Sequence, residues 1–369
     1  MTSSGAFAHL EGALATLSER GLLRARATAT ADDALVLCAN DYLGYAQELS
    51  GERVGAGASR LVAGTHPEHL ALEGAVASWL GTEDALVFTS GYAANVGLVS
   101  ALAGPEDVVI SDERNHASII DGCRLARARV VVVPHADARA VRAALRDHRD
   151  AAHRYVVTEG YFSMDGDVPD LRELRAACDA EGAALLVDEA HALGVLGPRG
   201  RGACALAGVV PDAIVGTFGK ALGAQGAFVA GPRVLVDWLW NRARSFVFST
   251  GLSPWLAARA RESVLRAQAD DSGRARLAAL GERLRGALRA LGYDVPLASV
   301  GPIVPVIVGA SEDAVALSRS LAERGVHASA IRPPTVAAGT ARLRVTVHAQ
   351  LGEAALESAI EAFRAARRR

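Results

Sequence analysis

Lysine is nearly absent from this chain. Of its 369 residues, 39 are lysine or arginine, and Lys220 is the one lysine among them. An arginine side chain stays protonated and is a poor nucleophile, whereas a lysine amine can lose its proton in a desolvated site and then attack a carbonyl carbon. This composition indicates that position 220 requires an amine, most simply one that forms a Schiff base. An ordinary surface lysine is the alternative, and the glycine-rich setting of residues 216–223 disfavours it.

Other absences narrow the class of protein. The four cysteines, Cys38, Cys123, Cys178 and Cys204, show no paired spacing, which argues against structural zinc and suits a reducing compartment, so we expect a cytoplasmic protein. No apolar run is long enough to cross a bilayer, and the first residues lack the pattern of a signal peptide. A net charge of −2 gives no electrostatic reason to expect nucleic acid as a partner. We therefore expect no membrane, no nucleic acid and no metal.

Apolar strand-like runs alternate with amphipathic helical runs between about residues 84 and 230. Such alternation predicts an α/β fold with a mostly parallel sheet buried between helices. Ligands of these sheets bind beyond the carboxyl ends of the strands, and the polar clusters of this chain fall at those ends. The expected strands lie near residues 85–88, 108–110, 130–133, 155–157, 184–187, 213–215 and 227–229.

The pattern changes after residue 253 and predicts a smaller α+β domain. Two arginine-rich helices are expected first, followed by alternating strands and helices that end in a helix. We expect three parts in the chain: an N-terminal segment over residues 1–36, a large cofactor-binding domain over residues 37–252 and the small domain over residues 253–369.

Asp188 narrows the chemistry that Lys220 serves. A Schiff-base lysine fits either an aldolase or a pyridoxal phosphate enzyme. Asp188 ends an apolar strand that precedes Lys220, and bound pyridoxal phosphate needs a carboxylate at its pyridine nitrogen so that the protonated ring accepts electrons. A helix N-cap or an ion pair is the alternative use of such an aspartate.

Further polar residues at strand ends suit the same cofactor. His191 is placed to reach the ring hydroxyl oxygen, and His116, which opens a helix, is placed to stack on the ring and move protons. Each histidine taken alone could equally be a cap or a surface residue. The turn that begins at Ser90 and Gly91 opens a helix and predicts a phosphate site, to which Thr217 adds a hydroxyl.

These blocks together resemble the α-oxoamine synthases, a family of pyridoxal phosphate enzymes with the fold of aspartate aminotransferase. Residues 331–344 resemble the branch that makes 8-amino-7-oxononanoate in biotin biosynthesis. The blocks that carry the family resemblance are Asn40–Gly44, Thr89–Asn95, Asn115–Ser118, Thr158–Asp167, Val187–His191 and Thr217–Lys220.

The resemblance implies a role for each residue of the site. Lys220, His116 and Asp188 are implied to be catalytic, with Lys220 bound to the cofactor. The remaining cofactor contacts are implied for Ser90, Gly91, Tyr92, Ser163, His191, Thr217 and Thr250, and the substrate contacts for Arg24, Asn40, Thr335 and Arg344.

The implied reaction condenses L-alanine with a pimeloyl thioester, of coenzyme A or of a carrier protein, and releases carbon dioxide. The resemblance also implies a homodimer with composite active sites, in which Thr250 reaches the phosphate of the partner subunit. Three alternatives stay open: a relative that condenses glycine or another amino acid with a different acyl-CoA, a cofactor-binding regulatory or scaffold protein on the same fold, and a cofactor-free lysine aldolase.

Overall fold

A seven-stranded sheet forms the centre of the larger part of the chain. The computed structural model describes residues 16, 18–21, 35–36, 56, 59–61 and 65–367. The strand order is β2-β8-β7-β6-β5-β3-β4; β8 runs antiparallel to its neighbours β2 and β7, and the other neighbours pair in parallel. The predicted, mostly parallel sheet is therefore confirmed. Its strands are β2 (Asp84–Phe88), β3 (Val108–Asp112), β4 (Arg129–Val133), β5 (Arg154–Glu159), β6 (Ala184–Asp188), β7 (Ala213–Thr217) and β8 (Ala227–Gly231).

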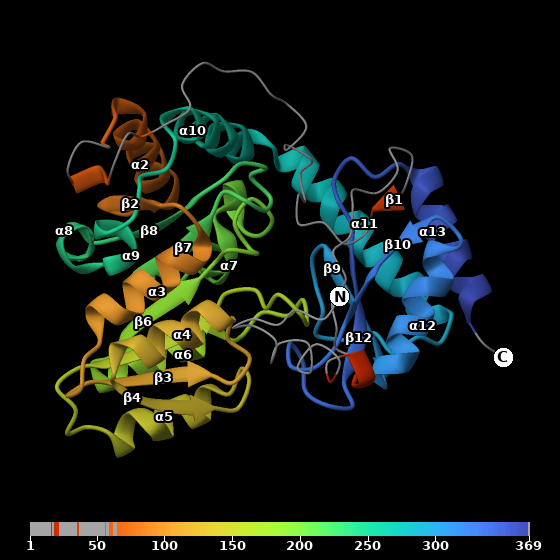
Figure 1. The fold of residues 1–369 in the computed structure, drawn as a ribbon, viewed down its shortest axis with the longest axis horizontal. Coiled ribbons are helices and arrows are strands. Elements are labelled where there is room, and N and C mark those ends of the chain that lie inside the picture. The colour runs from red at the N-terminus through yellow and green to blue at the C-terminus, as the bar shows by residue number, and fades with distance from the viewer. Residues whose placement is uncertain are drawn as a thin grey trace, which may run out of the picture.

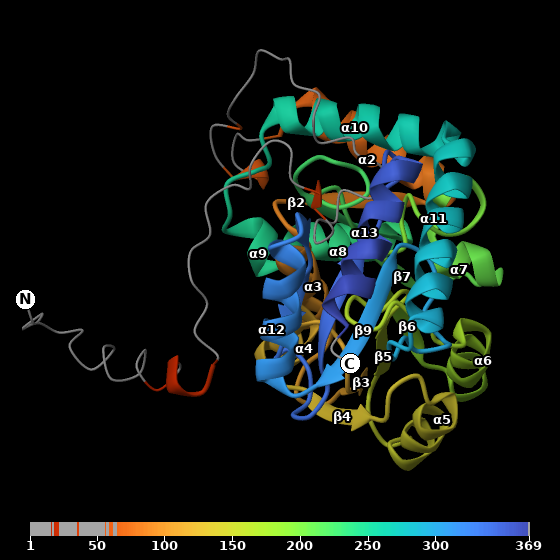
Figure 2. The same ribbon diagram turned by 90° about the vertical axis from the view of Figure 1, so that its right-hand side faces the viewer.

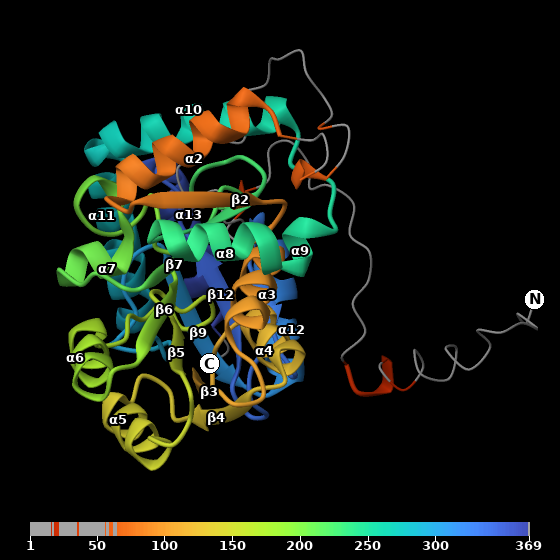
Figure 3. The ribbon, with the colours of Figure 1, turned by 90° about the vertical axis from the view of Figure 1, so that its left-hand side faces the viewer.

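Helices cover both faces of this sheet. Successive strand residues point to opposite faces, so Leu185 and Val187 join one buried core while Leu186 joins the other. Burial on both faces is why these strands are apolar throughout. One face carries α3 (Gly91–Leu102), α4 (Ala117–Ala126), α8 (Arg233–Arg242) and α9 (Arg244–Val247), seen together in Figure 3. The other face carries α2 (Pro67–Leu80), α5 (Ala138–Asp147), α6 (Leu171–Glu181), a 3₁₀ helix (Pro198–Gly200) and α7 (Gly202–Ala207).

A smaller antiparallel sheet lies beside the seven-stranded sheet and its helices (Figure 1). It has the order β11-β12-β9, and the short strand β10 pairs in parallel with β1. Figure 2 shows its helices α11, α12 and α13 around it. The elements are β1 (Leu35–Val36), α11 (Asp271–Ala290), β9 (Ile303–Gly309), α12 (Ser311–Ala322), β10 (Val326–His327), β11 (Ser329–Ile331), β12 (Ala341–Thr346) and α13 (Glu353–Ala366).

The first of the two predicted arginine-rich helices, α10 (Pro254–Ala269), packs against α2 at the top of Figure 1. This helix therefore covers the larger sheet part, although it follows residue 253. The domain limits at residues 36 and 252 stay predictions. Among the described residues, no helix combines the length and apolar character needed to cross a membrane.

A loop after β5 connects the two sheets. The hydroxyl of the buried Tyr161 donates to the carbonyl of Val300 at 2.6 Å and accepts from the backbone N–H of Ile303 at 3.2 Å. The N–H of Val300 in turn donates to the carbonyl of Gly166 at 2.6 Å. These contacts place the loop of residues 160–167, which is called the β5 loop below, between the carboxyl edge of the large sheet and β9 of the small one.

Removing the Tyr161 hydroxyl should destabilise the protein. In Tyr161→Phe, the carbonyl of Val300 and the N–H of Ile303 lose a buried partner, which costs about 1–3 kcal/mol in the free energy of unfolding. The midpoint of urea unfolding, followed by tryptophan fluorescence, measures this. The matched control is Tyr155→Phe, whose hydroxyl makes one long bond of 3.3 Å to Leu102 and should cost less. Equal shifts in the two variants would contradict this reading of the β5 loop.

Candidate functional site

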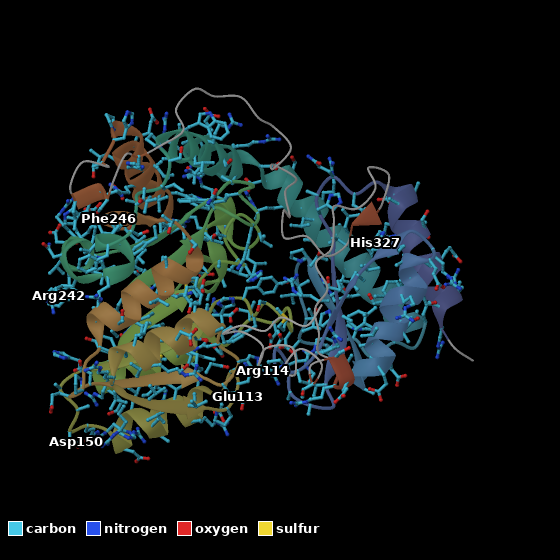
Figure 4. The ribbon with its side chains drawn as sticks, in the orientation of Figure 1. Glu113, Arg114, Asp150, Arg242, Phe246 and His327 are labelled. Atoms are coloured by element: carbon cyan, nitrogen blue, oxygen red, sulfur yellow. The ribbon has the colours of Figure 1, made fainter. Side chains whose placement is uncertain are left out.

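The polar ends of four neighbouring strands meet at one edge of the large sheet. Strands β3, β5, β6 and β7 are parallel, and they end at Asp112, Glu159, Asp188 and Thr217. Figure 4 labels Glu113 and Arg114, which follow β3, on the side of the sheet that faces the smaller part. This is the edge at which sheets of this type bind ligands.

Asp188 is buried at the tip of β6 and is held by two donors. Its Oδ1 accepts from the N–H of Ala190 at 2.8 Å, and its Oδ2 accepts from Nδ2 of Asn95, on α3, at 2.7 Å. The same Asn95 nitrogen contacts Oγ of Ser118 at 2.9 Å, and that oxygen lies 2.8 Å from Nδ1 of His116. One hydrogen-bonded chain therefore orients both the carboxylate of Asp188 and the ring of His116, which is the N-cap of α4.

Lys220 follows β7 and is surrounded by charged side chains. Burial lowers the pKa of its ammonium to about 8, although the negative charges of Asp188 and Glu159 oppose the shift; the guanidinium of Arg344 adds to it. A substantial share of Lys220 is therefore a neutral amine near pH 8. Such an amine is a nucleophile, as the composition of the chain indicated.

The two predicted histidines lie in the same electrostatic neighbourhood. Burial lowers the pKa of His191 well below its ordinary value, and the charges of Lys220, Arg344 and His116 lower it further. Desolvation also lowers the pKa of His116, where Asp188 opposes the shift and Lys220 adds to it. Both imidazoles are therefore favoured in their neutral form, in which one ring nitrogen donates and the other accepts.

Glu159 belongs to this cluster, although we did not select it from the sequence. Burial at the tip of β5 raises the pKa of its carboxyl to about 8, and the charge of Asp188 adds to the shift, while Lys220 opposes it. Its Oε2 accepts from the N–H of Ser163 at 3.2 Å. The signal available was its strand-end position in the Thr158–Asp167 block. Asn95 and Ser118 carried a similar signal, since each closes one of the family blocks.

Arg342 and Arg344 both lie buried on β12 of the small sheet, but they have different surroundings. Arg342 is paired with Asp165, with 2.5 Å between Nη1 and Oδ1. Arg344 donates from Nε to the carbonyl of Ser163 at 2.5 Å, and its charge acts on Lys220 and His191. The structure therefore brings Arg344 from the small sheet into the cluster at the edge of the large one.

The predicted phosphate residues gather at the start of α3. Ser90 is the N-cap of this helix and accepts from the N–H of Ala93 at 3.1 Å. A Cβ atom on Gly91 would lie 3.8 Å from Cβ of Thr217, so the helix start adjoins the end of β7. The hydroxyl of Thr217 donates to the carbonyl of Gly226 at 3.0 Å, which steadies the turn that carries Lys220. A helix N-terminus with adjacent hydroxyls suits an anion.

The remaining predicted residues lie in several places. Tyr92 is half exposed and donates to Oδ2 of Asp121 at 2.7 Å. Ser163 is buried in the β5 loop. Thr335 lies in an exposed turn after β11, and Thr250 is paired with Ser59 in an isolated β-bridge. Arg24 and Asn40 lie outside the described residues.

The polar groups at this edge fit pyridoxal phosphate. A buried carboxylate, that of Asp188, suits the protonated pyridine nitrogen, and the amine of Lys220 suits the aldehyde. The helix start at Ser90 and Gly91 suits the phosphate. Among the described residues, no group of His, Cys, Asp and Glu side chains could hold a metal ion.

The fold and this edge together define a pyridoxal phosphate-dependent enzyme of fold type I. The chain belongs to the family of class I and II aminotransferases, whose model matches residues 32–363. The resemblance to the α-oxoamine synthases is confirmed by its relatives and structural neighbours.

Three similar proteins narrow the class of reaction. The chain is 45% identical, over an alignment of 378 residues, to 8-amino-7-oxononanoate synthase of Geobacter sulfurreducens, and the match covers 96% of each chain. Serine palmitoyltransferase of Sphingomonas wittichii is 32% identical, with a TM-score of 0.90 over 98% of this chain and 96% of that chain. A structure of SPT with PLP is 30% identical, with a TM-score of 0.91 over 98% and 97%. The chain is a pyridoxal phosphate-dependent acyltransferase.

The rate at which Lys220 forms a Schiff base with pyridoxal phosphate should depend on the fraction of Lys220 that is neutral. Because the pKa is about 8, the rate constant with apoprotein should rise about tenfold per pH unit below pH 8 and level off above it. With an unperturbed lysine, the rate constant would keep rising to about pH 10. Stopped-flow absorbance measures the rate, and borohydride reduction followed by peptide mass spectrometry locates the cofactor.

Because Lys220 is the one lysine of the chain, replacing it provides a control for this measurement. Lys220→Arg leaves no lysine in the chain, so that only the terminal α-amino group can react. A pH midpoint near that of free lysine, or a pyridoxyl group found on the terminal amine of wild-type protein instead of Lys220, would refute the assignment.

Proposed function

We propose that this enzyme condenses L-alanine with a pimeloyl thioester to give 8-amino-7-oxononanoate, carbon dioxide and the free thiol carrier. The observation that carries the proposal is the cluster around Lys220, in which Asp188 of the large sheet and Arg344 of the small sheet both act on its amine. The curated relatives at about 45% identity support this choice of substrates.

The chain's own groups have distinct tasks in this proposal. Bound pyridoxal phosphate supplies an electron sink that stabilises negative charge at the substrate Cα. Asp188 holds a proton at the pyridine nitrogen, and Lys220 in its neutral form takes the α-proton of the amino acid. His116, oriented by Ser118 at 2.8 Å, is placed to donate a hydrogen bond to the thioester carbonyl. His191 and Ser163 contact the ring oxygen.

Arg344 is proposed to hold the carboxylate of L-alanine. Two parallel hydrogen bonds from a planar guanidinium fix a carboxylate in a way that an ammonium cannot copy. Arg342 pairs with Asp165, and the charge of Arg344 acts on the reacting amine of Lys220. The action of Arg344 on that amine supports it as the anchor. Thr335, Asn40 and Arg24 are proposed to contact the substrates as well.

The enzyme is further proposed to be a homodimer with composite sites. In support, Phe248, two residues before Thr250, is 72% exposed, with Arg244 over its ring. Mixing Lys220→Ala and Thr250→Ala subunits should then restore activity, because one site of each mixed dimer is intact. Activity no higher than that of the two parents would contradict shared sites.

Mass spectrometry of products tests the reaction itself. Holoenzyme is incubated with L-alanine, glycine or L-serine, each with pimeloyl-CoA and with palmitoyl-CoA. The expected product is 8-amino-7-oxononanoate from L-alanine and pimeloyl-CoA, at a higher rate than any other pair gives. Preference for glycine, for serine or for the long acyl chain would replace the proposal with another condensation of the same class.

Arg344→Lys should weaken the binding of L-alanine. Loss of the paired hydrogen bonds costs about 1.5–3 kcal/mol, which is about a 10- to 160-fold rise in the dissociation constant. Titration of the holoenzyme with L-alanine, followed by absorbance of the cofactor, measures it. Arg342→Lys keeps a positive charge next to Asp165 and should raise the constant less than Arg344→Lys does. If Arg342 proves the more sensitive position, the anchor is Arg342.

A further inference from the structure

His135 joins two strand ends to the β5 loop. It follows β4 and lies between two carboxylates. Its Nδ1 is 3.0 Å from Oδ1 of Asp112, at the tip of β3, and its Nε2 is 2.8 Å from Oδ2 of Asp167, at the end of the β5 loop. A neutral imidazole has one N–H, so only the imidazolium donates to both carboxylates at once.

Asp112 is itself fixed to the backbone. Its Oδ1 accepts from the N–H of Arg114 at 2.8 Å, and its Oδ2 accepts from the N–H of Ala136 at 2.7 Å. Asp112 is buried, so it is a rigid anchor on the large sheet rather than a mobile surface partner. The ring of His135 is thus held by the fixed carboxylate of Asp112 on one side and contacts Asp167 of the loop on the other.

Asp167 depends on His135. In the described part of the chain, the other oxygen of this carboxylate, Oδ1, is buried without a hydrogen-bond partner. The ring of Phe162 also packs edge-on against the imidazole, with 4.4 Å between centroids and an interplanar angle of 89°. Removing the imidazolium would leave a carboxylate in a partly buried place without its donor, and such a loss is costly.

The β5 loop transmits this restraint to the site. The N–H of Phe162 donates to the carbonyl of Asp167, and the N–H of Gly166 donates to the carbonyl of Phe162, both at 2.9 Å, so the two ends of the loop move together. Ser163 follows Phe162, and its carbonyl accepts from Nε of Arg344 at 2.5 Å. The position of that guanidinium therefore depends on where the loop is held.

We propose that the imidazolium of His135 is a positioning residue, which holds the β5 loop and, through Ser163, sets Arg344 for the carboxylate of the amino-acid substrate. The proposal rests on the proposed function for the identity of that substrate. In this proposal His135 acts through the loop and not by contact with substrate or cofactor.

Several charged groups surround this ring. From the end of β3 come Asp112, Glu113, whose carboxylate accepts from the N–H of His135 at 3.1 Å, and Arg114. From the β5 loop come Asp165, which pairs with Arg114 at 3.1 Å, and Asp167. Burial by itself would lower the pKa of His135, but its hydrogen bonds to Asp112 and Asp167, together with their charges, outweigh burial and raise the pKa to about 9. The restraint is therefore present at neutral pH and is lost as the pH rises through about 9.

His135→Gln tests the proposal in the holoenzyme. At pH 7.5 the KM for L-alanine should rise about 10-fold, which corresponds to about 1.4 kcal/mol, while the KM for the pimeloyl thioester should change less than about twofold. The ratio of variant to wild-type KM cancels the titration of the substrate itself. This ratio should fall toward one at pH 10, where wild-type His135 has lost its proton. A ratio that stays constant with pH would overturn the proposal.

His153→Gln is the control for the loss of a histidine–aspartate pair away from the loop. His153 also pairs with an aspartate, at 2.9 Å from Oδ1 of Asp107, but it lies at the opposite ends of the strands from the β5 loop. Its KM ratio should stay near one at both pH values. An equal rise in both variants would mean that loss of any such pair destabilises the protein, and the specific role would be rejected.

A second variant and a second measurement test the proposal even if His135→Gln does not fold. Asp167→Asn keeps the shape of the partner but removes its charge, and should raise the KM for L-alanine in the same direction. Hydrogen–deuterium exchange of apoprotein needs no activity: peptides over residues 160–168 should exchange faster in either variant, whereas peptides over α8 should not. Unchanged exchange of the β5 loop would overturn the proposal. A wild-type enzyme that exchanges normally but does not use L-alanine would instead reject the proposed function.

Discussion

The withdrawal of one amine from water is the constraint on which the rest of the site depends. Lys220 becomes a nucleophile near pH 8 because burial disfavours its charged form, yet Asp188 and Glu159 stand close enough to limit the shift. A lysine with no carboxylate nearby would lose its charge at a lower pH, and an exposed lysine would keep it past pH 10. The parallel sheet supplies this balance because it brings several strand ends, each with a polar group, to one edge.

The site also depends on a fixed position of the small sheet relative to the large one. Arg344 stands on the small sheet, while the groups on which its charge acts follow strands of the large one. The β5 loop makes this connection through contacts to both parts, with Tyr161 and Gly166 on the side of the small sheet and Ser163 on the side of the site. The positioning role proposed for His135 would account for a partly buried histidine held between two carboxylates at the base of this loop.

Much of the fold followed from local patterns. The strands near residues 85–88, 130–133 and 184–187 were expected from short apolar runs, and each appears within a residue of those limits. A helix was expected to open at His116, and α4 begins directly after this residue, which is its N-cap. These elements are predictable because periodicity and capping are properties of neighbouring residues. The packing of α10 against α2 is a contact between distant segments, and no local pattern indicates it.

The sequence by itself determined that the chain has one amine for carbonyl chemistry, that this amine follows a strand of a mostly parallel sheet and that Asp188 and the two histidines stand at neighbouring strand ends. Only the tertiary structure decided which groups act on that amine: that Glu159 shares its charge environment, that Asn95 bridges Asp188 and Ser118, that Arg344 differs from Arg342 in its surroundings and that His135 spans two strand ends and a loop. The reason is physical. Strand ends are set by residues adjacent in the chain, whereas pKa values and ion pairs depend on distances between loops that meet only after the sheets have folded.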